Sequence, residues 1–185
     1  KRADSVALLS ILAGTPYVPT NLRPSLENVP DDLPELYANG CHQSQNSTDA
    51  VGCLIGANPN APLVELFGDS HAAQWYPPLA VLAARGTIRL QTHTKSACPA
   101  ARMNNETDEC SLWADRVAAT LDAHPPDLIL MGNYSRYYVR FSDAPALEWS
   151  RALRAGIDAM PRVPVAVLAD TPSIGVEPRI CLGQF

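Results

Sequence analysis

The chain has 185 residues, of which 46% are hydrophobic and 18% are charged, so it has the size of one domain and enough apolar residues for one buried core. Its net charge of -5 comes without a cluster of Lys and Arg, which excludes a nucleic-acid-binding protein, because phosphates demand a basic surface. The longest apolar run near the start, residues 6–13, is too short to cross a bilayer. Since the chain begins with Lys-Arg rather than Met, we expect it to be a piece of a longer protein.

Prolines dominate the first part of the chain. Between residues 14 and 40 they recur at Pro16, Pro19, Pro24, Pro30 and Pro34. Proline fixes its own backbone and cannot donate to a helix or a sheet. We therefore expect residues 1–36 to be a stiff linker or stalk that follows a membrane region, and residues 37–185 to be the domain.

The cysteines predict local crosslinks. Cys41 and Cys53 flank one polar loop, Cys98 and Cys110 flank another, and Cys181 stands alone. No Cys-x-x-Cys pair and no zinc-ligand spacing to a histidine occurs, so two loop-closing disulfides are favoured over a metal site. Disulfides indicate an oxidising compartment, whereas five reduced, buried cysteines are the alternative. We expect the partner of Cys181 to lie downstream of Phe185.

Apolar runs alternate with amphipathic stretches from residue 63 onward. The runs predict strands over residues 63–67, 87–92, 127–131 and 163–169. Helices are expected over residues 72–85, ended by Gly86; from a Ser111 cap to the proline pair at 125–126; and after Asp143. The polar stretch between Cys41 and Cys53 is interpreted as a loop. This alternation predicts an α/β fold with three layers, in which a parallel sheet carries helices on both faces.

The stretch Leu63–Trp75 is the centre of the predicted fold. A strand leads directly into Gly68 and a helix follows His71, so Ser70 stands in a tight turn at a strand's carboxyl end. There its hydroxyl is exposed, and backbone N–H groups at the start of the helix can stabilise negative charge. Ligands of parallel sheets bind at this edge. The other loops expected at the same edge are residues 93–96, 132–133 and 170–171.

These residues resemble a known superfamily. Gly68-Asp69-Ser70-His71 after a strand is similar to the nucleophile block of the SGNH (GDSL-like) hydrolases. Three blocks together resemble a narrower group, the extracytoplasmic SGNH domain fused to membrane-bound acyltransferases that O-acetylate bacterial envelope glycans. The blocks are Tyr37-Ala-Asn-Gly-Cys41-His, Gly68-Asp-Ser-His-Ala-Ala-Gln-Trp75 and Thr94-Lys-Ser-Ala-Cys98-Pro. The resemblance covers residues 35–185 and implies an SGNH-hydrolase-like, flavodoxin-like sandwich.

The resemblance implies a role for each matching residue. Ser70 matches the nucleophile, and its own N–H would be one donor to the oxyanion. Asn133 matches the asparagine whose side-chain amide faces the oxyanion, although Gly132 and Asn133 are adjacent here instead of separated by one residue. The second-block glycine has no clear counterpart, so a backbone N–H near Ser96 is the candidate for the remaining donor.

The base of the family is missing from this sequence. Family members carry an Asp-x-x-His pair near the carboxyl terminus, and no such pair occurs here, so we expect the domain to be incomplete and to continue beyond Phe185. A serine hydroxyl needs a base to become a good nucleophile. His71, which follows the nucleophile, and His93 are weaker candidates for a substitute base, and Asp170 is a weak candidate for its partner.

The implied function is acyl transfer. An acyl group, expected to be acetyl, would pass from the membrane acyltransferase domain through Ser70 to an envelope glycan or to water, without a cofactor or a metal. Lys95, Ser96 and His71 are the candidate substrate contacts. The implied location is the extracytoplasmic face of the cell membrane.

Other interpretations remain open. Ser70 could merely cap a helix, Asn133 could satisfy a turn, and Lys95 could be a solvated charge. Without its base, the domain could be a catalytically silent module that binds glycan or positions the membrane domain. The residues Asp69, His71 and Asn133 superficially resemble a metallophosphoesterase, but the Asp-x-x-Asp block of that class is absent.

Overall fold

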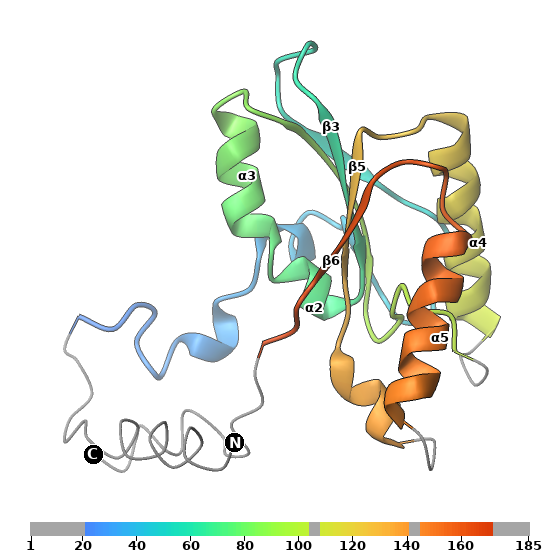
Figure 1. Ribbon diagram of the computed structural model, residues 1–185. Helices are drawn as coiled ribbons and strands as arrows, with labels where there is room; N and C mark the ends of the chain where they lie inside the picture. Colours follow the sequence, from blue (N-terminus) through green and yellow to red (C-terminus); the bar gives the residue numbers. More distant parts are fainter. Residues whose placement is uncertain (1–20, 104–107, 141–144, 172–185) are drawn as a thin grey trace, which may run out of the picture. The chain divides into compact units, whose positions relative to one another are not determined.

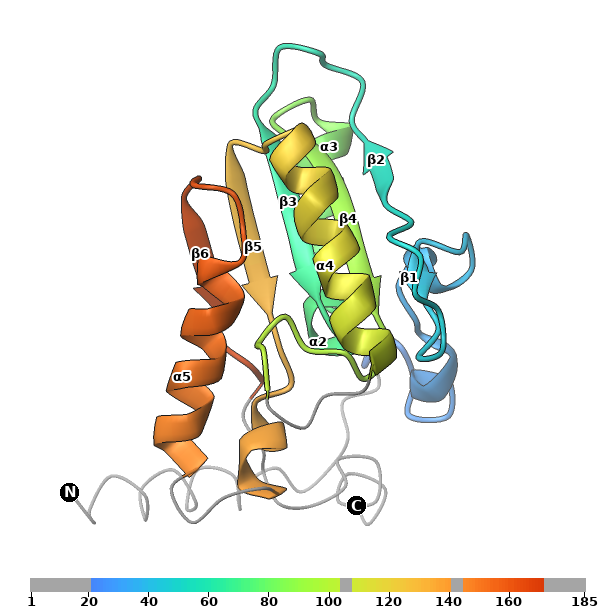
Figure 2. The ribbon, with the colours of Figure 1, turned by 90° about the vertical axis from the view of Figure 1, so that its right-hand side faces the viewer.

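A six-stranded sheet forms the centre of the computed structural model, which describes residues 21–103, 108–140 and 145–171 (Figure 1). Its main path has the order β1-β4-β3-β5-β6. β2 lies off this path and also pairs with β4. The strands are β1 (His42–Gln43), β2 (Cys53–Ile55), β3 (Leu63–Gly68), β4 (Arg89–Lys95), β5 (Leu128–Gly132) and β6 (Val165–Leu168). Figure 2 shows β6, β5, β3 and β4 side by side. All pairs are parallel except β2 with β4.

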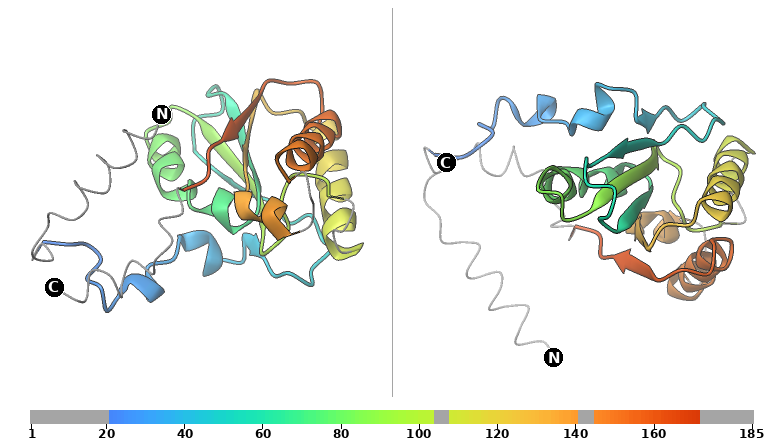
Figure 3. Two further views of the ribbon diagram at one scale, coloured as in Figure 1. Left: turned by 60° about the horizontal axis from the view of Figure 1, so that its bottom comes forward. Right: turned by 90° about the horizontal axis from the view of Figure 1, so that it is seen from above.

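Helices cover both faces of the sheet. One face carries α2 (Ser70–Ala73) and α3 (Tyr76–Ala84), and the other carries α4 (Asp108–Ala123) and α5 (Pro145–Asp158), as Figures 1 and 3 show. Each face has its own apolar cluster: Leu66, Leu90 and Tyr76 belong to the first, and Phe67 and Trp113 to the second. The predicted three-layer α/β fold is therefore confirmed. The compact unit that contains it spans Pro34–Asp170.

The described residues also form three 3-10 helices: η1 (Val29–Asp31), η2 (Glu35–Tyr37) and η3 (Ser135–Arg140). The first belongs to a separate unit formed by Lys1–Leu33 and Thr171–Phe185. Leu36 of η2 is completely buried in the α2–α3 cluster. The predicted boundary between a linker and a domain at residues 36 and 37 stays a prediction.

Two glycines let α2 approach the sheet closely. Gly68 and Gly132 are paired at the carboxyl ends of β3 and β5. Gly68 has a φ of +144°, and a Cβ there would collide with the Gly132 carbonyl oxygen. A Cβ at Gly132 would come within 2.7 Å of the Ala72 Cα. Because neither has a side chain, the helix that begins at Ser70 lies directly on the ends of the two central strands.

The helix expected over residues 72–85 is divided. α2 ends at Ala73 and α3 begins at Tyr76, with Pro77 and Pro78 in the first turn of α3, where proline needs no N–H partner. The predicted end at Gly86 is confirmed. Gly86 has a φ of +71°, its N–H donates to the Ala83 carbonyl, and the next N–H, of Thr87, donates to the Leu82 carbonyl.

Other element predictions were wrong. Ser111 was expected to cap a helix, but α4 begins at Asp108 and places Ser111 inside its first turn. Residues 93–95 were expected in a loop, but β4 continues to Lys95 because β1 pairs with its last two residues. The stretch between Cys41 and Cys53 was expected to be a loop throughout, yet β1 and β2 lie at its ends.

Candidate active site

The turn from β3 into α2 places Ser70 at the carboxyl edge of the sheet. Asp69 is extended and caps α2, and its Oδ1 accepts a hydrogen bond of 2.8 Å from the His71 N–H. Ser70 is the first helical residue and is partly exposed. The capping role is thus taken by Asp69, which leaves the Ser70 hydroxyl for another role.

Asp69 also joins this turn to the end of β5. Its Oδ2 accepts a hydrogen bond of 2.8 Å from the Tyr134 N–H. Burial raises the pKa of Asp69, and the hydrogen bonds from Tyr134 and His71 only partly offset this effect. The Asp69 carboxyl group therefore fixes the spacing between the Ser70 turn and the Asn133 turn.

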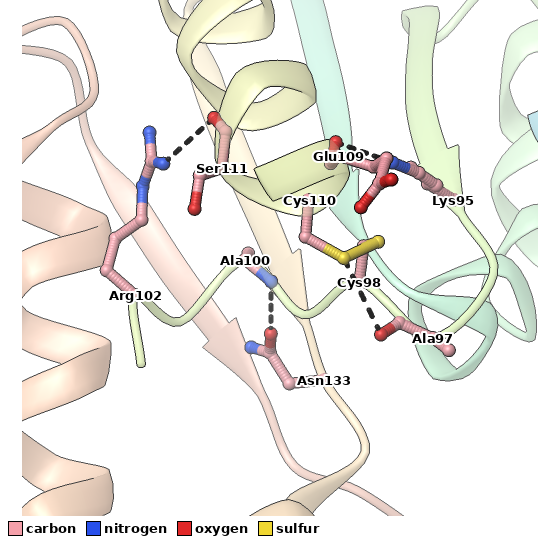
Figure 4. The surroundings of a disulfide bond; sticks show 9 residues. All are labelled: Lys95, Ala97, Cys98, Ala100, Arg102, Glu109, Cys110, Ser111 and Asn133. Carbon is pink, nitrogen blue, oxygen red and sulfur yellow. Dashed lines mark hydrogen bonds between the residues drawn. A yellow bond between two sulfur atoms is a disulfide. The ribbon is translucent and has the colours of Figure 1, made fainter. Parts of the chain in front are cut away.

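Asn133 directly follows β5, and its amide is oriented by the loop after β4. The Asn133 Oδ1 accepts hydrogen bonds from the backbone N–H groups of Ala100, at 2.6 Å, and Ala101, at 3.3 Å (Figure 4). The Asn133 Nδ2 is buried and has no hydrogen-bond partner within the described part of the chain. Because a buried donor without a partner is costly, this N–H group is available to a ligand.

A third connection comes from the end of β6. The Asp170 Oδ1 lies 2.5 Å from the His71 Nδ1, and the Asp170 Oδ2 accepts hydrogen bonds from the Ser135 backbone N–H, at 2.8 Å, and the Ser135 hydroxyl, at 2.9 Å. Burial acts to raise the pKa of Asp170, but the hydrogen bonds from Ser135 and His71 outweigh it and lower that pKa. Asp170 is therefore an ionised carboxylate, and it accepts a hydrogen bond from the Nδ1–H group of His71. From the sequence, Asp170 was ranked low as a catalytic partner and its pairing with His71, 99 residues away, was not predicted.

The other two candidate contacts, Lys95 and Ser96, have polar partners within the fold. Lys95 is fully buried, so it is not a solvated charge; its Nζ donates to the Glu109 carbonyl at 2.7 Å and lies 5.7 Å from the centre of the Trp113 ring. Burial lowers the pKa of Lys95. The Ser96 N–H donates to the Gln43 carbonyl, and the Ser96 hydroxyl lies 3.0 Å from the His42 Nε2. The ammonium group of Lys95 therefore faces the core.

The backbone next to Ser96 has an unusual shape. Ala97 is exposed and has a φ of +56°, a conformation that glycine adopts more readily than alanine. Ala97 lies in the loop in which the resemblance left the second-block glycine without a clear counterpart. No sequence signal could have identified it, because alanine rarely marks a left-handed residue.

His93 was considered as a substitute base near the sheet edge. It lies instead within β4, and its Nδ1 is 3.0 Å from the Glu65 Oε1. Both side chains are buried, and burial raises the pKa of Glu65. The expected loop position of His93 was therefore wrong, and its ring belongs to the core under α4.

Both predicted disulfides are confirmed. Cys41 is bonded to Cys53 and Cys98 to Cys110. The Cys98–Cys110 bond fastens the start of the loop that carries Ala100 to the first turn of α4 (Figure 4). Cys181 lies outside the described residues.

The described residues also yield two negative findings. Over residues 21–103, 108–140 and 145–171, no group of three or more His, Cys, Asp and Glu side chains could hold a metal ion. Within the same ranges, no helix has the length and hydropathy needed to cross a membrane.

Comparison with known proteins identifies a family. A family model described as "SGNH domain (fused to AT3 domains)" matches residues 40–184. A solved structure, the periplasmic domain of a lipopolysaccharide acetyltransferase of Salmonella ser. Paratyphi A, is similar to 78% of this chain over 57% of its own length, with a TM-score of 0.49 and 16% sequence identity. Curated protein sequences contain no significant match.

Proposed function

Since the chain belongs to the family of SGNH domains fused to AT3 domains, we propose that it is the acyl-transferring domain of a membrane acyltransferase. In this proposal the AT3 membrane domain supplies an acyl group, expected to be acetyl. Ser70 carries it to an envelope glycan at the extracytoplasmic side of the membrane. The two disulfides support an oxidising location.

The amide of Asn133 is the observation that carries the proposal. Its oxygen is occupied by backbone N–H groups, so its buried Nδ2 has a fixed direction and no partner in the described part of the chain. Asp69 links its turn to the Ser70 turn through the Tyr134 N–H. A preorganised donor beside a nucleophile is the arrangement that stabilises an oxyanion.

The proposed reaction has two half-reactions. The Ser70 Oγ attacks the carbonyl carbon of the acyl donor, its proton passes to a base, and the bond to the leaving group breaks. Asn133 and the Ser70 N–H stabilise the negative charge on the carbonyl oxygen. In the second half, an acceptor hydroxyl attacks the acyl-serine, loses its proton to the base, and releases Ser70. By resemblance, the base is the histidine of the family's Asp-x-x-His pair, a spacing that does not occur among the 185 residues.

A substitution of Ser70 tests this proposal. Acetate release from p-nitrophenyl acetate by the full-length protein is expected to fall by at least about 10³-fold in Ser70→Ala, because the residual rate of such enzymes comes from the oxyanion donors and binding alone. Ser150→Ala, an exposed serine of α5, is the matched control. Equal rates in wild type and Ser70→Ala would instead favour an accessory module without its own chemistry.

A further inference from the structure

The imidazole of His71 is oriented more firmly than a surface histidine. Its Nδ1 faces Asp170, whose second oxygen is held by the backbone N–H and the hydroxyl of Ser135. An ionised carboxylate accepts a hydrogen bond and cannot donate one, so Nδ1 carries the hydrogen that faces Asp170. In the neutral form of the ring, Nε2 then presents a lone pair, and within the described residues no group binds it.

Aromatic rings extend this orientation. The Tyr134 ring lies 4.6 Å from the His71 ring at an angle of 36°, and the Tyr137 ring meets Tyr134 edge-on at 5.1 Å. All three side chains are partly exposed. Together they form a short aromatic row, His71–Tyr134–Tyr137, that begins at the residue after Ser70.

We propose that His71 and Tyr134 form the subsite that binds the acyl acceptor, and that this acceptor is a neutral sugar. In this subsite the Nε2 of His71 accepts a hydrogen bond from a sugar hydroxyl, while the apolar face of the sugar ring packs on Tyr134. The inference rests on the proposed function, because an acceptor site is useful only beside an acyl-serine.

The position of His71 fits an acceptor site. Its Cα is about 3.8 Å from that of Ser70, as for any consecutive residues. Ser70 and His71 both belong to α2, and Asp170, which holds the His71 ring, follows β6. A hydroxyl bound at Nε2 would therefore lie at the same edge of the sheet as Ser70, and positioning of an acceptor beside an acyl group is a major source of rate enhancement.

The charges around His71 indicate the class of acceptor. The ionised carboxylate of Asp170 holds the His71 ring and disfavours a phosphate or carboxylate at Nε2. Asp69 accepts the backbone N–H of His71, is buried and has a raised pKa, so it adds no charge at the ring. A neutral hydroxyl donor with an apolar face suits one lone pair beside an aromatic ring.

Binding can be measured without any acyl donor, which separates this inference from the Ser70 chemistry. The full-length protein would be titrated with methyl α-D-glucopyranoside while ¹⁵N resonances of His71 and ring resonances of Tyr134 are followed by NMR. Glycerol, which has hydroxyl groups but no ring, is the control ligand. We expect the glucoside, at equal concentration, to shift both sets of resonances at least about fivefold more than glycerol, because glycerol lacks the ring contact.

Two variants sharpen the test. His71→Phe keeps an aromatic ring beside Tyr134 but removes Nε2, and Asp170→Asn removes the charge that orients it. Each is expected to weaken glucoside binding about tenfold, the value of one lost hydrogen bond. In Asp170→Asn the ¹⁵N shifts of His71 should also lose the pattern of an Nδ1–H tautomer, a change that a folding defect does not produce. Unchanged glucoside affinity in the folded variants, or equal shifts with glycerol, would overturn the subsite.

Discussion

The Asn133 Oδ1 lies 2.6 Å from the Ala100 nitrogen, so one side chain at the end of β5 holds the backbone of the loop that follows β4. The same amide has an unpartnered Nδ2 within the described residues. Asn133 thus combines a structural contact with a candidate catalytic one, and the two can be separated by substitution.

Asn133→Ala removes both contacts. We expect acyl transfer to fall by about 10²–10³-fold, as for the loss of one oxyanion donor. The free energy of unfolding should fall by about 1–3 kcal/mol, because the Ala100 N–H is left buried without its partner. Rates with p-nitrophenyl acetate and urea unfolding curves measure the two effects.

Asn133→Asp is the matched variant, because its carboxylate still accepts the Ala100 N–H but has no N–H to donate. Its rate should fall as far as that of Asn133→Ala. A rate near that of wild type would show that Nδ2 contributes nothing to the reaction.

Asp69→Ala should destabilise the fold by about 1–3 kcal/mol, since it removes the cap of α2 and the acceptor of the Tyr134 N–H. Asp69→Asn should lose less, because asparagine still caps a helix although its NH₂ group cannot accept the second hydrogen bond. Urea denaturation measures both variants. Equal stability of Asp69→Ala and wild type would contradict the bridge between the two turns.

The two disulfides offer a controlled comparison because each spans 12 residues. Replacing either pair by serines should reduce the free energy of unfolding by a similar amount, about 3 kcal/mol. Acyl transfer should fall further in the Cys98/Cys110 variant, because that bond fastens the loop that orients Asn133. The Cys41/Cys53 variant is the control. Equal rates in the two variants, measured below their unfolding temperatures, would argue against this link.

His42 should make stability depend on pH. Its ring nitrogens lie 2.9 Å from the Thr94 hydroxyl oxygen and 3.0 Å from that of Ser96, and burial lowers its pKa to about 4. Between about pH 6.5 and 4 the unfolded chain binds a proton that the folded ring excludes, so this contribution to stability is complete above about 6.5 and is lost as the pH falls through this window.

The size of the loss by pH 4 should be about 2–3 kcal/mol. In urea titrations, His42→Gln should therefore lose less stability than wild type between pH 6.5 and 4. The exposed His124 provides the control substitution, His124→Gln. Parallel pH curves for wild type and His42→Gln would show that the His42 ring is not excluded from protonation.

The core of the fold was predictable because a buried strand is a run of apolar residues, which can be recognised from the sequence of that segment alone. Apolar runs located β3, β5 and β6, and the strand-end rule correctly gathered Ser70, Asn133 and Asp170 at one edge. β1 (His42–Gln43) and β2 (Cys53–Ile55) were missed because segments of two and three residues are too short to show a strand pattern, and they become strands only by pairing with β4. Lys95 was missed as a buried residue for a similar reason: its partner is the Glu109 carbonyl, which no local pattern indicates.

The site was only partly predictable. The Gly-Asp-Ser-His block singled out Ser70, since a motif is a local signal. The His71–Asp170 pair has no such signal, because only the folding of β6 beside β5 brings the two residues together. The second hydrogen bond of Asp69, to Tyr134, is likewise a tertiary contact.

A covalent adduct tests the central claim most directly. The full-length protein would be treated with an excess of p-nitrophenyl acetate, quenched in acid, and examined by intact-mass and peptide mass spectrometry. The account predicts one added acetyl group on the peptide that contains Ser70, and none on that peptide in Ser70→Ala. An acetyl group on another residue, with the Ser70 peptide unmodified, would contradict it.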